Sequence, residues 1–533
     1  MRHSLHRLLV FVALVLSLGP LALGCASETA TSTTAPSQDG NNTVTTASGA
    51  APVPGAVLAV AIEPFKDLDP AWLASTGDVF LARQVYERLV EQEASGGLVP
   101  GLALSWEHSG ATAWTFELRS DVLFHDGEEF DANDVVHTFE RLRDLAKSAP
   151  ALSGFDNIES VTALDPAQVK FVLLHPDPEF PALLASDPAA VLSEKVSDPV
   201  HEWVGTGPFA LWSYVPAQGA VLKRHVDYWR RDAAGRRLPY LDGVDLVFSR
   251  DSGTRLGELL SGRVGFVGGL TAKEVTQVRA SPGLFAAERP SNDHFAIHVQ
   301  SDAGHLGADV RVRQALKLAT DREALIRAAR PGLAVPGADT PFGPLYDDMR
   351  SDVDPPFDPA AATGLLVEAG FPSGLSGELL VEDEPEALLV AEEWTRQMAE
   401  IGVLLEVKSV ASGPYQSDGD ASWLSAEFWV TRWSTEVSPR AYLRSVYSPV
   451  APMSGTWWDD EEFRTVLADL AVEGDEARRR ELYLAVERIL RERGPVVVPF
   501  FMTTAVGLDR RVQGLELAPY WPRTTLRAVS FAS

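Results

Sequence analysis

The chain has 533 residues, so we expect two or three domains, because single hydrophobic cores stop growing at about 250–300 residues. Aspartate and glutamate outnumber lysine and arginine by 74 to 46, and the net charge of -28 argues against nucleic acid as a partner. The single cysteine excludes an intramolecular disulfide and any site with several thiolate ligands.

The amino-terminal segment has the pattern of an export signal. Arg2 and Arg7 precede an apolar run at residues 8–18, which is too short to span a bilayer and ends in small residues. The sequence LALGC that follows resembles a bacterial lipobox, with Ala22 where leucine is usual, and the resemblance implies that Cys25 carries a lipid. We therefore expect a lipoprotein signal peptide; a plain secretory signal with an incidental cysteine is the alternative.

The segment at residues 26–55 is rich in serine, threonine, alanine and glycine. It has almost no large apolar residue, so it cannot bury enough surface to fold by itself. We expect a flexible tether that separates a folded body from the membrane.

The folded body is predicted to be a mixed α/β protein. AVLAVAIEP, from residue 56, has the character of a first strand, and strand-like and helix-like segments then alternate to the end of the chain. Apolar residues at three- and four-residue spacing predict helices within the ranges 79–92, 309–329, 358–370, 387–402 and 475–494. Asp131 is predicted to cap a further helix.

The sequence shows no arrangement of residues typical of an enzyme. It lacks a glycine-rich phosphate loop, a Gly-x-Ser-x-Gly elbow and a His-Glu-x-x-His helix. His294 and His298 would share one face of a strand, but no third ligand is evident, so we expect ordinary strand histidines and neither a metal site nor a cofactor. Trp106, Trp114 and Phe116 are expected in the core.

Six segments, in order along the chain, resemble signatures of the family 5 extracellular solute-binding proteins, the peptide and nickel receptors of ATP-driven importers. They are LVPGLALSWEHSGATAWTFELRSDVLFHDGEEFDANDVVHTFERL, VGTGPFAL, ADVRVRQALKLATDREALI, FDPAAATGLLVEAGF, RQMAEIGVLLEV and ERGPVVVPFF. The resemblance implies the two-lobe fold of type II (class C) periplasmic binding proteins, with an extra domain in the amino-terminal lobe.

The expected division of the chain follows from this resemblance. Two strand crossings between the lobes are expected near residues 296–302 and 490–500. The predicted parts are the signal peptide with its lipobox (1–25), the tether (26–55), lobe I (56–92), the extra domain II (93–200), lobe I again (201–298), lobe II or domain III (299–495) and the return to lobe I (496–533).

The segment AEFWVTRWSTEVSPRAYL, from residue 426, contains the candidate ligand residues. It resembles the part of peptide receptors in which a tryptophan precedes, by three residues, an aspartate that binds the ligand's terminal amine; Trp433 and Glu436 stand at these positions. A solvent-facing loop glutamate is the alternative for Glu436. Arg432 could pair with a ligand carboxylate.

Alternation along a strand would place Trp429 and Trp433 on one side and Arg432 and Ser434 on the other, so only one set would line the cleft. Peptide receptors of this family also bind the ligand backbone through this segment.

The expected function is that of a substrate-binding lipoprotein of an importer, which captures oligopeptides or dipeptides between two closing lobes. The expected partners are the ligand, the permease and ATPase subunits of an ABC importer, and a membrane reached through the lipid anchor. We expect a monomer outside the cytoplasm. The alternatives are a receptor for an oligosaccharide, a nickel chelate or an opine-like compound, and a peptide sensor that transports nothing.

Overall fold

A computed structural model describes residues 52–149, 152, 154–351, 353–415, 423, 426–434, 438–448 and 455–532. All of them belong to one compact unit of the chain. The predicted signal peptide and nearly all of the predicted tether lie outside the described residues, and so do Cys25 and Glu436. Within the described part of the chain, no helix is both long enough and apolar enough to cross a membrane.

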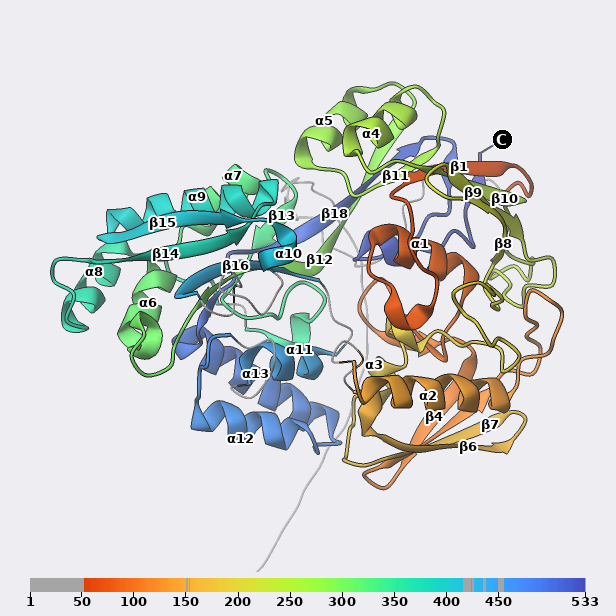
Figure 1. The fold of residues 1–533 in the computed structure, drawn as a ribbon, viewed down its shortest axis with the longest axis horizontal. Helices are drawn as coiled ribbons and strands as arrows, with labels where there is room; N and C mark the ends of the chain where they lie inside the picture. The colour runs from red at the N-terminus through yellow and green to blue at the C-terminus, as the bar shows by residue number, and fades with distance from the viewer. Residues whose placement is uncertain are drawn as a thin grey trace, which may run out of the picture. The chain divides into compact units, whose positions relative to one another are not determined.

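The framework is a mixed sheet of twelve strands (Figure 1). From one edge to the other, the strands are β15 (Val403–Val410), β14 (Leu375–Glu382), β16 (Phe428–Trp433), β12 (Leu284–Val299), β18 (Phe500–Asp509), β11 (Phe266–Gly268), β1 (Val57–Ile62), β10 (Gly243–Phe248), β9 (Gly219–Arg224) and β8 (Phe209–Val215). The short strands β13 (Ala334–Pro336) and β17 (Val496–Val497) pair with β18 and β12. We call the part around β1 and β8–β11 lobe I, and the part around β13–β17 lobe II.

The long strands β12 and β18 belong to both lobes. Residues 284–290 of β12 pair antiparallel with β18, and residues 294–299 pair with β16. On β18, residues 500–502 pair with β13 of lobe II and residues 506–508 with β11 of lobe I. β12 therefore crosses between the lobes at residues 290–294, before the expected 296–302, and β18 crosses at 502–506, after the expected 490–500.

Helices cover both faces of the sheet in lobe II. One face buries Phe295, Phe428 and Val430 beneath helices that include α9, and the other buries Ala296 and Phe501 beneath helices that include α13. The helices of the first face are α6 (Val310–Leu318), α7 (Arg322–Ala329), α8 (Pro359–Glu368) and α9 (Pro385–Glu400). Those of the second face are α11 (Pro439–Tyr447), α12 (Glu461–Leu470) and α13 (Glu476–Arg493), and a short α10 (Ser412–Tyr415) adjoins β14.

In lobe I, α1 (Thr76–Val85) packs on one face of the sheet, and α4 (Ser252–Leu260) and α5 (Ala272–Ala280) pack on the other. Short antiparallel pairs are formed by β2 (Val90–Gln92) with β3 (Leu98–Pro100), and by β19 (Val512–Gln513) with β20 (Ser530–Phe531). The 3-10 helices are η1 (Pro70–Trp72), η3 (Phe155–Asn157), η4 (Asp187–Ala189), η5 (Leu306–Ala308), η6 (Asp347–Met349) and η8 (Trp521–Arg523).

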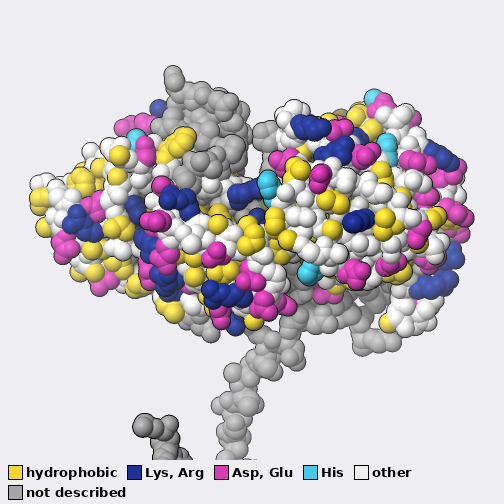
Figure 2. Space-filling view, turned by 90° about the horizontal axis from the view of Figure 1, so that it is seen from below, with side chains coloured by type: hydrophobic (Ala, Val, Ile, Leu, Met, Phe, Trp, Pro, Cys, Tyr) yellow, Lys and Arg dark blue, Asp and Glu magenta, His cyan; other side chains and the backbone are white. Residues whose placement is uncertain are grey.

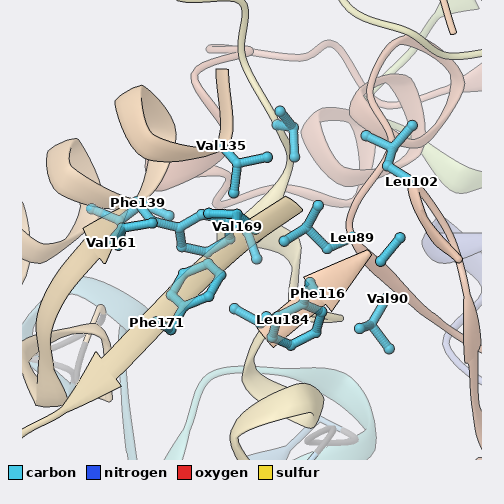
Figure 3. Packing of buried hydrophobic residues seen from close by; sticks show 14 of the residues in the cluster. Leu89, Val90, Leu102, Phe116, Val135, Phe139, Val161, Val169, Phe171 and Leu184 are labelled. Atoms are coloured by element: carbon cyan, nitrogen blue, oxygen red, sulfur yellow. The ribbon is translucent and has the colours of Figure 1, made fainter. Parts of the chain in front are cut away.

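A separate four-stranded sheet forms the core of the extra domain. Its order is β4 (Ala103–Ser109), β5 (Ala113–Leu118), β7 (Gln168–Leu173) and β6 (Ile158–Asp165), and α2 (Ala132–Ala146) and α3 (Phe180–Leu183) pack against it. Phe116, Phe139 and Phe171 meet in this core, with ring centroids 5.1 Å apart for Phe139–Phe171 and 5.5 Å for Phe116–Phe171 (Figure 3). Of the three aromatics predicted for the core, Trp114 and Phe116 are buried, and Trp106 is partly buried and packs against this core.

The predicted helices are largely confirmed, with two differences. The segment 79–92 leaves the helix after Val85 and forms β2 at residues 90–92. The segment 309–329 is two helices, because Asp321 caps a new helix by accepting a hydrogen bond from the amide of Ala324. Asp131 caps α2 as predicted, in a reciprocal capping box with Asp134.

The surface of the described residues mixes charges of both signs. Figure 2 shows lysine and arginine side chains interspersed with aspartate and glutamate over the face that it draws.

Glu87 organises the polar interior of lobe I. This carboxylate, 3% exposed, accepts hydrogen bonds from four side chains: Thr206 Oγ1 at 3.1 Å, Tyr228 OH at 2.8 Å, Trp229 Nε1 at 2.7 Å and Arg230 Nε at 3.1 Å. Four donors offset the cost of burying the charge.

The GTGP turn lies against the end of α1, and this close approach brings Thr206 to Glu87. A side chain at position 205 would place its Cβ 2.1 Å from the carbonyl oxygen of Val85, and one at position 207 would lie 2.6 Å from that of Gln84. Glycine is therefore required at both positions by close approach of the backbone. The intervening Thr206 can then donate to Glu87.

The substitution Glu87→Gln is expected to destabilise the fold by about 3 kcal/mol, because an amide leaves Arg230 without its charge partner and one oxygen cannot serve all four donors. Urea unfolding followed by circular dichroism measures the change. Glu107→Gln, on the exposed side of β4, is the matched control and should stay within about 0.5 kcal/mol. Equal loss of stability in both variants would contradict this role for Glu87.

Candidate functional site

The end of β16 opens into a pocket in lobe II, next to the crossing of β12. The cavity is small: the space that a water-sized sphere can occupy in it is about 10 Å³, enough for about one water molecule. Four segments line it, namely the bulge of β12, the loop around residues 341–346, the end of β16 and the beginning of α11. The lining residues are Asn292, His294, Pro341, Phe342, Tyr346, Ser434, Pro439 and Tyr442.

His294 forms the polar part of the pocket wall. Its Nδ1 donates to the carbonyl oxygen of Asn292 at 2.8 Å, so its Nε2 accepts a hydrogen bond from Tyr442 OH at 2.9 Å. Burial lowers the pKa of His294 to about 4, and the ring is neutral at pH 7. The wall therefore combines a neutral imidazole with a phenol that is already engaged.

His298 lies four residues along β12 on the same face, beneath Trp429. The two rings are stacked, with centroids 4.9 Å apart and an interplanar angle of 1°. Nε2 of His298 lies 2.7 Å from Oγ1 of Thr431, and burial lowers the pKa of His298 to about 3. The expectation that these histidines share a strand face is confirmed.

The predicted ligand residues of β16 differ in how deeply they are buried. Trp429 is fully buried with Tyr415 and Trp423, whereas Trp433 is half-buried and packs edge-on against Tyr442, with centroids 5.5 Å apart. Ser434, just beyond the strand, is exposed and lines the pocket.

Arg432 is exposed near the boundary between the lobes. Its register partner on β12 is Phe295. Burial raises the pKa of Tyr520 to about 12, and the charges of both Asp293 and Arg432 act on this phenol. Burial also lowers the pKa of Arg330, and the positive charge of Arg432 adds to that shift. Arg432 therefore lies near Tyr520 from the carboxyl-terminal segment and Arg330 from lobe II.

Four of the five predicted ligand residues are described, and Trp433, Ser434 and Arg432 are the three with exposed surface. Glu436 lies outside the described residues. Asn292, Phe342, Tyr346 and Tyr442 line the pocket but were not among the residues predicted from the sequence. The loop from Pro341 has no periodicity that would have marked its aromatic residues, and Tyr442 lies within a helical pattern. His294 was noted, and its strand position was the usable signal.

Among the described residues, no group of three or more histidine, cysteine, aspartate or glutamate side chains is arranged to hold a metal ion. What the pocket wall offers a ligand is aromatic surface, a serine hydroxyl and neutral histidine. An exposed arginine lies nearby on β16.

Acid is expected to destabilise the protein through His294 and His298. Their folded-state pKa values lie below the ordinary 6.5, so the unfolded state binds more protons, and stability present above pH 6.5 is lost as the pH falls toward 4. Each histidine should remove about 2 kcal/mol between pH 8 and pH 5.

Urea unfolding at these two pH values measures the loss, and His298→Gln should reduce it. His201→Gln is the control, because His201 is 76% exposed in its side chain. An unchanged pH dependence in His298→Gln would contradict the assignment.

The curated relatives of the chain include proteins that bind short peptides. The di/tripeptide-binding protein 1 of Pseudomonas aeruginosa is 28% identical over 495 residues, which cover 85% of this chain and 90% of that protein.

Solved structures share the fold. The ABC transporter-associated periplasmic binding protein DppA from Helicobacter pylori, in complex with the peptide STSA, has a TM-score of 0.73 and 24% identity, with 90% of this chain and 99% of that chain covered. The periplasmic binding protein AgaA from Agrobacterium tumefaciens, in complex with agropinic acid, has a TM-score of 0.74 and 22% identity, with the same coverage. These likenesses confirm the predicted class of fold.

The relatives are binding proteins, in agreement with the absence of an enzyme motif from the sequence. The family model of the bacterial extracellular solute-binding proteins, family 5, middle region, matches residues 97–452, about two thirds of the chain. Five of the six quoted segments lie within this range, and ERGPVVVPFF, at residues 492–501, lies beyond it. The chain belongs to the family 5 bacterial extracellular solute-binding proteins.

Proposed function

We propose that the chain is the receptor component of an ABC importer and that its ligand is a short peptide, bound at the end of β16 and delivered to permease and ATPase subunits. The name of the di/tripeptide-binding relative and the peptide complex of the Helicobacter pylori protein support this class of ligand. A single feature of the described residues favours a peptide in particular.

That feature is an open main-chain edge on β16. Its parallel pairing with β14 ends at Val430, whereas its antiparallel pairing with β12 continues to Trp433. Within the described part of the chain, residues 431–433 thus have a partner strand on one side only. A peptide backbone can form hydrogen bonds with such an edge by strand addition, without strict selection of side chains.

The sequence at and just after this edge offers groups for a ligand with two charged ends. Arg432 would pair with a carboxylate, and Glu436 would bind the terminal amine. Trp433 lies on the opposite face of β16 from Arg432, so it would contact a peptide added to the edge from the other face of the sheet, and Ser434 would contact the peptide where the strand ends. Trp429 would support Trp433 from within the core, because it is fully buried and packs on His298.

Arg432→Gln is expected to weaken binding of a free dipeptide by roughly ten- to hundredfold, because a charged hydrogen bond is lost. The same variant should bind the amidated dipeptide as wild type does. Glu436→Gln should show the complementary pattern, with a loss for the free amine and none for the N-acetylated peptide. Isothermal titration calorimetry measures these affinities. Arg444→Gln, an exposed arginine on α11, is the control.

Unchanged affinity of Glu436→Gln for the free dipeptide would rule out the amine contact. Mass spectrometry of the solute that co-purifies with the native protein tests the ligand class itself. Recovery of a sugar or an opine in place of a peptide would reject the proposal.

The second candidate is a receptor for an acidic opine. The observation that favours it is the exposed Arg432, which suits any carboxylate, and AgaA was solved with agropinic acid in the same fold. An oligosaccharide would stack on Trp433 and Tyr442, and a nickel chelate would have to bring most of its own ligands. A peptide sensor without transport would bind the same peptides. Loss of peptide uptake in cells that lack the protein would indicate transport, and unchanged uptake would indicate a sensor.

We also propose that Cys25 attaches the protein to the outer face of a membrane. Cells fed an alkyne fatty acid should label the wild-type protein, and Cys25→Ser should lose the label and release the protein into the soluble fraction. Ser27→Ala, two residues along the chain, is the matched control and should keep the label. An unlabelled wild-type protein that is still exported would indicate a plain secretory signal.

A further inference from the structure

Two carboxylates of the extra domain contact helices of lobe II. They are Asp177 and Glu179, in the turn between β7 and α3 (Figure 1). Arg440 donates to Asp177 Oδ1 at 2.5 Å. Ser438 Oγ donates to Glu179 Oε2 at 2.5 Å, and both Arg479 and the hydroxyl of Tyr483 donate to Glu179 Oε1. We call these six residues the acidic latch.

The acidic latch is shielded from water. The side chains of Asp177, Glu179, Arg440 and Arg479 are 10–16% exposed. Charges so placed interact more strongly than those on an open surface, and salt screens them less. Burial and the charge of Glu179 raise the pKa of Tyr483 well above its usual range, so this phenol remains a neutral donor.

The latch joins the wall of the pocket. Ser438 caps α11 by accepting a hydrogen bond from the amide of Ala441, while its hydroxyl donates to Glu179. Pro439 follows directly, and Tyr442 lies one turn on; both line the pocket. A carboxylate of the extra domain therefore holds the first turn of the helix that carries the pocket wall.

We propose that Asp177 and Glu179 are positioning residues, which stabilise the closed arrangement of the two lobes and the beginning of α11 before any ligand binds. The ion pairs join the extra domain to lobe II, and lobe opening would separate them. The free energy of the closed state relative to the open state then depends on the chain's own charges even without ligand, and ligand contacts add to it. This inference concerns the closing equilibrium and does not rest on the identity of the ligand.

Single-molecule FRET on the full chain tests the proposal. Cys25→Ser removes the only cysteine, so Glu107→Cys in the extra domain and Glu368→Cys on α8, both exposed, allow specific labelling. The labelled protein is unfolded, dialysed and refolded to remove retained solute. A closed population is expected without ligand, and Glu179→Gln and Asp177→Asn should each lower the ratio of closed to open molecules by about fivefold or more.

Two further variants separate the latch from a general loss of charge. Glu481→Gln removes an acid on α13 that forms an ion pair with Arg478 on the surface, where the two side chains are 56% and 65% exposed. This variant should leave the ratio of closed to open molecules unchanged. The double charge reversal Asp177→Arg with Arg440→Asp should restore closure lost in either single reversal.

An unchanged ratio in both Glu179→Gln and Asp177→Asn, or a wild-type protein that is open without ligand, would overturn the proposal. No solute enters the measurement, so failure of peptide binding would leave it intact.

Discussion

The antiparallel pairing of β12 with β18 is the constraint on which the structure depends. Both strands run through the two lobes, and they change neighbours at the same level, β12 at residues 290–294 and β18 at 502–506. Side chains hold the bulge of β12 at this level: Ser291 Oγ donates to the carbonyl oxygen of Met502 at 2.9 Å, and Asn292 Oδ1 accepts from the amide of Leu345 at 2.9 Å. The pocket lies at this bulge, because Asn292 and His294 line it.

Buried charge fixes the other junctions of the molecule. Asp187 of the extra domain forms ion pairs with Arg83 of α1 and with Arg523 of the carboxyl-terminal segment. Arg88 is its third cationic partner. Burial alone would raise the pKa of Asp187, but these arginines hold it well below its usual range. Three stretches distant in sequence are joined at one carboxylate, so the extra domain is anchored firmly to lobe I. Its contact with lobe II depends on a second group of ion pairs, those of Asp177 and Glu179.

The sequence predicts those parts of the fold that depend on local chemistry. Asp131 caps its helix where expected, because a carboxylate that accepts from a free amide needs only its neighbours. The helix predicted to 92 ends at Val85 because Glu87 and Arg88 turn inward to distant partners, which local periodicity does not show. The strand crossings were misplaced by several residues for the same reason, since strand pairing decides where a lobe ends.

The site was predictable only where it follows a strand. Alternation placed Trp429 and Trp433 apart from Arg432, and this holds, but it could not show that Trp429 is buried under Trp423. Phe342 and Tyr346 reach the pocket through a loop whose path is set by Gly343, where a Cβ would lie 2.5 Å from Asn292 Oδ1. No periodic pattern encodes such a path.

The placement of the acidic latch bears on how this receptor would select its ligand. If the edge at residues 431–433 binds a peptide backbone as proposed, it would read side chains only loosely, and selectivity would come from how well the lobes close over the ligand. If Glu179 already holds the beginning of α11, a ligand that displaces Tyr442 breaks the hydrogen bond between Tyr442 and His294 and has to move a helix that the latch holds, whereas one that fits adds its contacts to a closed state already formed.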